Sequence, residues 1–154
     1  SLEDWEEVNA VNMRGVFLGC RAAVRAMRED GGGSIVNIGS ILSLTADPFL
    51  TSYTATKHGV LGLTRALAVD YAAAGIRANC VLPGDMETPM ILEYFAASDD
   101  PEATRKEMED AYPIKRIARP REVAQAVLFL ASDESSFVSG AELLVDGALT
   151  VKAY

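Results

Sequence analysis

Hydrophobic side chains recur every three or four residues in two long stretches of the chain, residues 5–27 and 53–74. This spacing predicts two long amphipathic helices. Ser1 and Asp4 supply an N-cap and an acidic first turn for the first helix, which three consecutive glycines then end. Gly75 is the expected C-terminal cap of the second helix.

Three shorter runs of the chain are predicted to be strands. They are "SIVNIGS", "IRANCVLPG" and "GAELLVDG", at residues 34–40, 76–84 and 140–147. The first is rich in β-branched residues and predicts a strand that is buried on both faces. A further helix is expected to begin with Pro120 as its first residue and to end near Leu130.

Strands alternate with helices along the chain, and this order predicts an α/β fold with a parallel sheet and helices on both of its faces. Residues 1–154 should form a single domain, because no linker, repeat or low-complexity tract interrupts them. The segment 85–113 differs from the rest, since it is acidic, rich in Met and aromatic residues, and interrupted by prolines. We expect short mobile helices there.

Composition narrows the classes of function. The chain has 154 residues, 49% of them hydrophobic, and a net charge of -8 without a basic patch, so nucleic acid is not an expected partner. No apolar run approaches the roughly 18 residues of a membrane span, and no signal peptide is seen, so a cytoplasmic protein is expected. Cys20 and Cys80 should be buried free thiols. The acidic residues between 99 and 110 have no metal-ligand spacing with His or Cys, so no metal is expected.

Candidate chemistry gathers where the predicted strands end, since ligands of such sheets bind at the carboxyl ends of the strands. Ser40 ends the first strand, and Pro83 and Gly84 end the second. Tyr53 and Lys57 open the helix between them, four residues apart and therefore on one face. A positive charge beside a phenol favours the phenolate, so such a tyrosine can act as acid and base. A serine hydroxyl alongside could hold a substrate oxygen, which indicates carbonyl or alcohol chemistry.

The spacing of these residues resembles the active-site motif of the short-chain dehydrogenase/reductase family. Ser40 is followed by twelve residues and then by Tyr53-x-x-x-Lys57. "VNMRGVFLGCRAA" resembles the helix that carries the family's active-site asparagine, here Asn12, and "VLPGDMETPM" resembles its nicotinamide loop, P-G-x-x-x-T-P. The last helix and strand resemble the family as well, so the likeness extends over essentially all 154 residues.

The resemblance implies a role for each matching residue. Tyr53 would be the general acid or base, Lys57 would make it more acidic and hold the nicotinamide ribose, and Ser40 would position the substrate oxygen. Asn12 would hold a water that links Lys57 to solvent. The cofactor-binding set would be Tyr53, Lys57, Pro83, Gly84, Met86 and Thr88. Two departures from the family pattern, Thr56 and Ala148, are expected to lie apart from the chemistry.

The activity that the resemblance implies is that of an oxidoreductase using NAD or NADP, which interconverts a secondary alcohol and a ketone by hydride transfer. The sequence does not indicate which cofactor is preferred. Residues 85–113 would form a substrate lid over an apolar pocket for a small molecule. The two long helices would pack against their copies in a homodimer or homotetramer.

The family's glycine-rich cofactor turn is not found in this sequence. The expected fold is therefore a Rossmann-like doubly wound sheet truncated to about three parallel strands, the C-terminal catalytic half of the domain. The chain could be a fragment of a longer enzyme, which the filled active-site positions favour. It could also be a shortened, catalytically inactive scaffold or oligomerisation fragment. Dehydratase or epimerase chemistry with the same Tyr and Lys is a third alternative.

Overall fold

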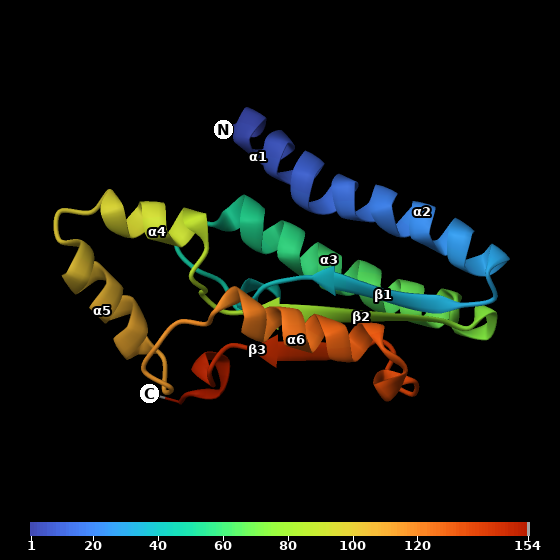
Figure 1. Ribbon diagram of the computed structural model, residues 1–154. Helices are drawn as coiled ribbons and strands as arrows, with labels where there is room; N and C mark the ends of the chain where they lie inside the picture. The colour runs from blue at the N-terminus through green and yellow to red at the C-terminus, as the bar shows by residue number, and fades with distance from the viewer. Residues whose placement is uncertain (154) are drawn as a thin grey trace.

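A single parallel sheet organises the computed structural model of the protein, which describes residues 1–153 (Figure 1). Its strands are β1 (Gly33–Ile38), β2 (Ile76–Pro83) and β3 (Glu142–Val145), in the order β1-β2-β3. β1 and β3 both run parallel to β2. This confirms the predicted Rossmann-like α/β fold with a truncated sheet of three parallel strands.

Helices cover both faces of this sheet. α2 (Val16–Glu29) and α3 (Thr51–Asp70) lie on one face, with α1 (Leu2–Asn9) beside α3, and α6 (Pro120–Ala131) lies on the other (Figure 1). Because β2 is the central strand, seven of its eight side chains are buried. The hydrophobic core is therefore centred on β2.

The first predicted helix is interrupted. Ser1 and Asp4 form the expected capping box, but a π-helical turn, residues Ala10–Gly15, separates α1 from α2. A π-turn inserts one residue into the helical repeat, so the hydrophobic pattern shifts by only one position and the interruption is hard to see in the sequence. Asn12 lies within this wide turn.

The second long helix begins and ends earlier than predicted. α3 starts at Thr51 and ends at Asp70, and Ala72–Ala74 form a separate 3₁₀ turn. Gly75 closes that turn in a left-handed conformation, with φ of 73°. The glycine is thus a cap, as expected, but of the 3₁₀ turn rather than of the α-helix.

β1 is buried less completely than the sequence predicts. Ile35 and Asn37 are buried beneath α2 and α3, whereas Ile38 is 43% exposed. The reason is that β1 is an edge strand of the described sheet, and on its other face it packs against α6. The expectation of a strand buried on both faces is therefore wrong.

The segment 85–113 forms two short helices that project beyond the carboxyl ends of the strands (Figure 1). These are α4 (Pro89–Ala96) and α5 (Pro101–Ala111), each with proline in its first turn. Phe95, Tyr112 and Ile117 make a small core of their own at this end of the molecule.

Two further predictions concern the state of the cysteines and the presence of a membrane-spanning helix. Cys20 and Cys80 are unpaired and buried, as predicted, and burial raises the pKa of both thiols. Within residues 1–153, none of the helices combines the length and the apolar character that a bilayer crossing requires.

Candidate active site

The carboxyl ends of β1 and β2 open into one cavity of about 560 Å³. Ser40 follows β1, Tyr53 lies in the first turn of α3, and Pro83 and Gly84 end β2, and all four line this cavity. The parallel register places both strand ends at the same edge of the sheet, which is why residues distant in sequence meet here.

Ser40 is held rigidly at the wall of the cavity. Its hydroxyl accepts a hydrogen bond from the backbone N–H of Leu42 at 3.1 Å, and its own backbone N–H donates to Ser43 Oγ at 3.2 Å. Ser43 in turn donates to the carbonyl of Lys57 at 2.9 Å, which ties this turn to α3. The Ser40 hydroxyl hydrogen is not used in these bonds and can point toward a ligand oxygen.

Lys57 lies one helical turn from Tyr53 and contacts the face of its ring. The Lys57 Nζ is 5.3 Å from the ring centre and donates a hydrogen bond to the carbonyl of Ile38 at 3.1 Å. Burial lowers the pKa of the Lys57 ammonium. The ammonium is thus anchored between the end of β1 and the phenol.

Asn12 reaches this region through Thr56. Asn12 Nδ2 lies 3.5 Å from Thr56 Oγ1, which donates to the carbonyl of Tyr53 at 2.7 Å. Thr56 is buried, with 2% of its surface exposed. Thr56 thus lies beside the candidate site, because its hydroxyl connects Asn12 to the backbone of Tyr53.

The loop after β2 is clamped from two sides. On one side, the backbone N–H of Asp85 donates to the hydroxyl of Tyr112 at 2.6 Å, and that hydroxyl donates to Asp85 Oδ2 at 2.8 Å. On the other side, Ala118 exchanges backbone hydrogen bonds of 2.9 Å with Asp85 and Glu87. A side chain at Gly84 would approach the Tyr112 hydroxyl to 2.8 Å, so the clamp requires glycine there.

The predicted site residues divide into two groups. Ser40, Tyr53, Pro83, Gly84 and Met86 line the shared cavity. Asn12, Lys57 and Thr88 are not among the residues that line it. The Lys57 ammonium lies over the ring of Tyr53, and Asn12 contacts Thr56. Thr88 is the N-cap of α4, and its Oγ1 accepts a hydrogen bond from the N–H of Ile91 at 3.5 Å.

Comparison with known proteins identifies the family. A sequence profile described as enoyl-(acyl carrier protein) reductase matches residues 1–150. The 2-(R)-hydroxypropyl-CoM dehydrogenase of Xanthobacter autotrophicus is 47% identical over 149 residues, which are 97% of this chain and 58% of that protein. The chain belongs to the short-chain dehydrogenase/reductase family.

Two further members of the short-chain dehydrogenase/reductase family show the extent of the match. The cyclohexanol dehydrogenase of an Acinetobacter species is 45% identical over 99% of this chain and 57% of its own length. A gluconate 5-dehydrogenase of Burkholderia cenocepacia, solved with NADP and tartrate, has a TM-score of 0.91 at 36% identity, over 99% of this chain and 58% of that one. The chain spans a little under three fifths of the length of the curated relatives it matches.

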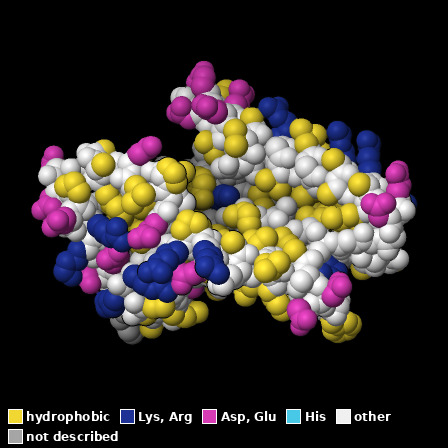
Figure 2. All heavy atoms as spheres, viewed as in Figure 1, with side chains coloured by type: hydrophobic (Ala, Val, Ile, Leu, Met, Phe, Trp, Pro, Cys, Tyr) yellow, Lys and Arg dark blue, Asp and Glu magenta, His cyan; other side chains and the backbone are white. Residues whose placement is uncertain are grey.

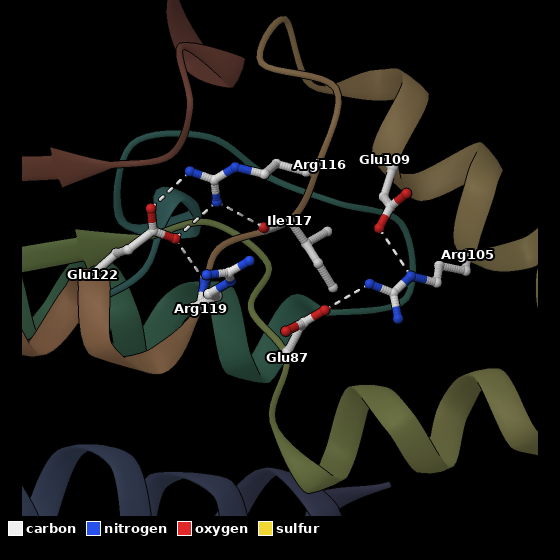
Figure 3. A network of polar contacts seen from close by, with 7 residues as sticks. All are labelled: Glu87, Arg105, Glu109, Arg116, Ile117, Arg119 and Glu122. Carbon is white, nitrogen blue, oxygen red and sulfur yellow. Dashed lines mark hydrogen bonds and ion pairs between the residues drawn. The ribbon is translucent and has the colours of Figure 1, made fainter.

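Ion pairs connect the loop after β2, α5 and the first turn of α6 (Figure 3). Arg105 of α5 bonds to Glu87 of that loop at 2.6 Å and to Glu109 at 2.9 Å. Arg116 bonds to both carboxylate oxygens of Glu122 in the first turn of α6, at 2.7 and 2.8 Å. The loop is thereby connected to α5, and the segment before α6 is connected to α6.

Two residues of this region, Tyr112 and Thr56, lie outside the predicted set of site residues. Burial raises the pKa of the Tyr112 phenol, which keeps it a hydroxyl donor to Asp85. Its partner is 27 residues away in sequence, so no local pattern reveals the pairing. For Thr56 a signal existed, because it lies three residues after Tyr53 and a threonine can bond back to a carbonyl on the preceding turn.

Proposed function

We propose that the chain carries the catalytic part of an oxidoreductase that uses NAD or NADP and interconverts a secondary alcohol and a ketone. The main support is that Ser40 and Tyr53 line one cavity while the Lys57 ammonium lies against the Tyr53 ring. Relatives named cyclohexanol dehydrogenase and 2-(R)-hydroxypropyl-CoM dehydrogenase support the same class of reaction. A single domain over 1–154 would hold this catalytic half.

The residues present fit a nicotinamide cofactor. Lys57 has three N–H donors and uses one on the Ile38 carbonyl, which leaves two for a pair of ribose hydroxyls. Pro83, Gly84 and Met86 present a wall of the cavity, and the Thr88 hydroxyl hydrogen is available to a carboxamide. A bound nicotinamide would accept or supply the hydride.

Proton transfer falls to Tyr53 in this proposal. Its hydroxyl would donate a proton to the carbonyl oxygen of a ketone and accept one from an alcohol. The Ser40 hydroxyl would hold the same oxygen, and the positive charge of Lys57 would favour the phenolate. Asn12, held by Thr56, would bind a water that returns the proton to solvent.

The segment 85–113 would serve as the substrate lid. Met86 and Met90 from this segment line the cavity, and Arg105 ties α5 to the loop that would contact the cofactor.

We also propose a cytoplasmic location for the protein, because Cys20 and Cys80 are unpaired thiols.

The first test is whether the natural protein, purified from the organism that makes it, binds a nicotinamide cofactor. NADH and NADPH would be titrated by fluorescence or calorimetry, and turnover would then be measured with secondary alcohols. We expect one cofactor to bind and Tyr53→Phe to lower kcat by at least about 100-fold, since general acid–base catalysis contributes on this order. Tyr71→Phe, which removes the same hydroxyl next to the other end of α3, should leave kcat unchanged.

Two outcomes would contradict the proposal. If neither cofactor binds up to millimolar concentration, the inactive scaffold becomes the better explanation. If a cofactor binds but Tyr53→Phe retains full kcat, the tyrosine is not the acid or base, and a different reaction on the same fold is indicated.

A further inference from the structure

The cavity shared by Ser40 and Tyr53 is mainly hydrocarbon away from these two hydroxyls. Its apolar lining comes from four separate segments of the chain: the turn after β1, the start of α3, the lid and the C-terminal segment. These side chains are Ile41, Leu42, Leu50, Met86, Met90 and Leu149. A volume of about 560 Å³ lies within the range of pockets that enclose small organic ligands.

The charges of the cavity are of one sign. Asp47 and Asp85 line it, although the Asp85 carboxylate is bonded to the Tyr112 hydroxyl, and no lysine, arginine or histidine of residues 1–153 is among the lining residues. Lys57 is nearby, but its ammonium lies against the Tyr53 ring and bonds to Ile38. It therefore belongs to the end of the site where the alcohol carbon would react, not to the region that holds the rest of a substrate.

Two of the apolar side chains that line the cavity are exposed to solvent. Met90 on α4 is 75% exposed and Leu50 is 40% exposed, although both line the cavity. Figure 2 shows hydrophobic side chains around the hollow between α4 and the body of the molecule, with one basic side chain, in dark blue, inside it. A carboxylate, sulfonate or phosphate held in the apolar part of the cavity, away from the Ser40 and Tyr53 hydroxyls, would lose water without gaining a cation from the lining residues, which is costly.

We propose that the substrate is a neutral, largely hydrocarbon secondary alcohol or its ketone, such as a cycloalkanol, and that this site disfavours alcohols that carry an anionic group. The proposal rests on the proposed oxidoreductase function. It follows from the apolar lining, the negative charge of Asp47 and the lack of a lining cation among the described residues.

A matched pair of substrates tests this proposal. Cyclohexanol and cis-4-hydroxycyclohexanecarboxylate share the ring and the reacting carbinol and differ by one carboxylate. The assay uses the natural protein and the cofactor that it binds. We expect kcat/KM for cyclohexanol to be at least about tenfold higher than kcat/KM for the carboxylate, because the carboxylate would lose water near a negative charge of the site. An equal or higher kcat/KM for the carboxylate would overturn the proposal.

A charge variant separates electrostatic exclusion from poor shape. Asp47→Asn should lower the ratio of kcat/KM for cyclohexanol to kcat/KM for the carboxylate by about threefold, because it removes one charge at a solvent-exposed position of the site. Asp99→Asn removes the same charge at an exposed position outside the cavity lining and should leave the ratio unchanged. An unchanged ratio in Asp47→Asn would contradict the electrostatic part of the proposal.

Binding without turnover distinguishes failure of this proposal from failure of the proposed function. Saturation-transfer NMR with cyclohexanone and 4-oxocyclohexanecarboxylate reports ligand binding whether or not hydride transfer occurs. If neither alcohol is oxidised but only the neutral ketone binds, the oxidoreductase function fails and the preference of the cavity stands. If the carboxylate binds as well as the neutral ketone, the proposed preference is wrong even for an active enzyme.

Discussion

Tyr112 shows how a single buried hydroxyl can position a loop from outside the candidate site. Only 2% of the residue is exposed. Its oxygen accepts from the Asp85 backbone and donates to the Asp85 carboxylate. Because Gly84 lies directly against this hydroxyl and also lines the cavity, the position of Tyr112 determines where that wall of the cavity lies.

Tyr112→Phe should therefore destabilise the protein. The substitution leaves a backbone N–H and a carboxylate oxygen of Asp85 without their partner, at a cost of about 1–3 kcal/mol. The change would be measured as the free energy of unfolding in urea. Tyr94→Phe, at an exposed position on α4, is the control and should change stability by less than about 0.5 kcal/mol. Equal stability of both variants would mean that water replaces the hydroxyl.

Two residues that depart from the family pattern behave differently in the structure. Thr56 supplies the hydroxyl that Asn12 contacts, so its side chain belongs to the surroundings of Tyr53. Ala148 has a φ of 69°, a left-handed conformation that favours glycine, and it lies on the surface after β3. Its strain is therefore separate from the candidate chemistry.

At the scale of elements, the first turn of α6 is anchored by charge. Arg116 and the backbone N–H of Arg119 both donate to the carboxylate of Glu122 (Figure 3). The hydrogen bonds from Arg116, and after them the one from Arg119, lower the pKa of Glu122 to about 2. The ionised carboxylate thus stabilises the junction between α6 and the segment before it.

This anchor should make stability depend on pH in the acidic range. Because the folded pKa of Glu122 is lower than its unfolded value of about 4.3, the contribution is complete above that value and is lost as pH falls toward 2. The difference in urea midpoint between the wild type and Glu122→Gln should shrink by about half from pH 7 to pH 3.

The control for this pH dependence is Glu107→Gln, an exposed position on α5. Its difference from the wild type should be small at both pH values. A Glu122→Gln difference that is the same at pH 3 and pH 7 would show that the ion pair with Arg116 does not form in solution.

At the scale of the whole molecule, several large hydrophobic side chains face water. In the π-turn, α2 and α3 they are Val11, Phe17, Leu18 and Val69, and on and beyond α6 they are Leu128, Phe129 and Phe137. Exposed apolar groups of this kind are typical of interfaces. We propose that these two regions pack against copies of the chain in a homodimer or homotetramer.

Light scattering after size exclusion would test this assembly. We expect a mass two or four times that of the chain, and Phe17→Asp should lower it, because a buried unpaired carboxylate opposes association. Val151→Asp, at an exposed position of the C-terminal segment, should not change the mass. A wild-type mass equal to one chain would contradict the assembly.

The alternation of helices and parallel strands, and the relative positions of Ser40, Tyr53 and Lys57, could be predicted from the sequence alone. These features depend on local periodicity and short spacing. A helix with Tyr53 and Lys57 one turn apart, directly after a strand that ends at Ser40, follows from neighbouring residues alone. The predicted strands and the helix that starts with Pro120 were found for the same reason.

How distant segments meet could not be predicted in this way and is seen only in the folded chain. The contact of Tyr112 with the Gly84–Asp85 loop and that of Asn12 with Thr56 join residues 27 and 44 positions apart. The second contact also involves a π-turn that hydrophobic periodicity does not reveal. The exposure of Ile38 likewise depends on which helices cover β1. Such contacts depend on strand register and helix packing, which the hydrophobic pattern of one segment does not encode.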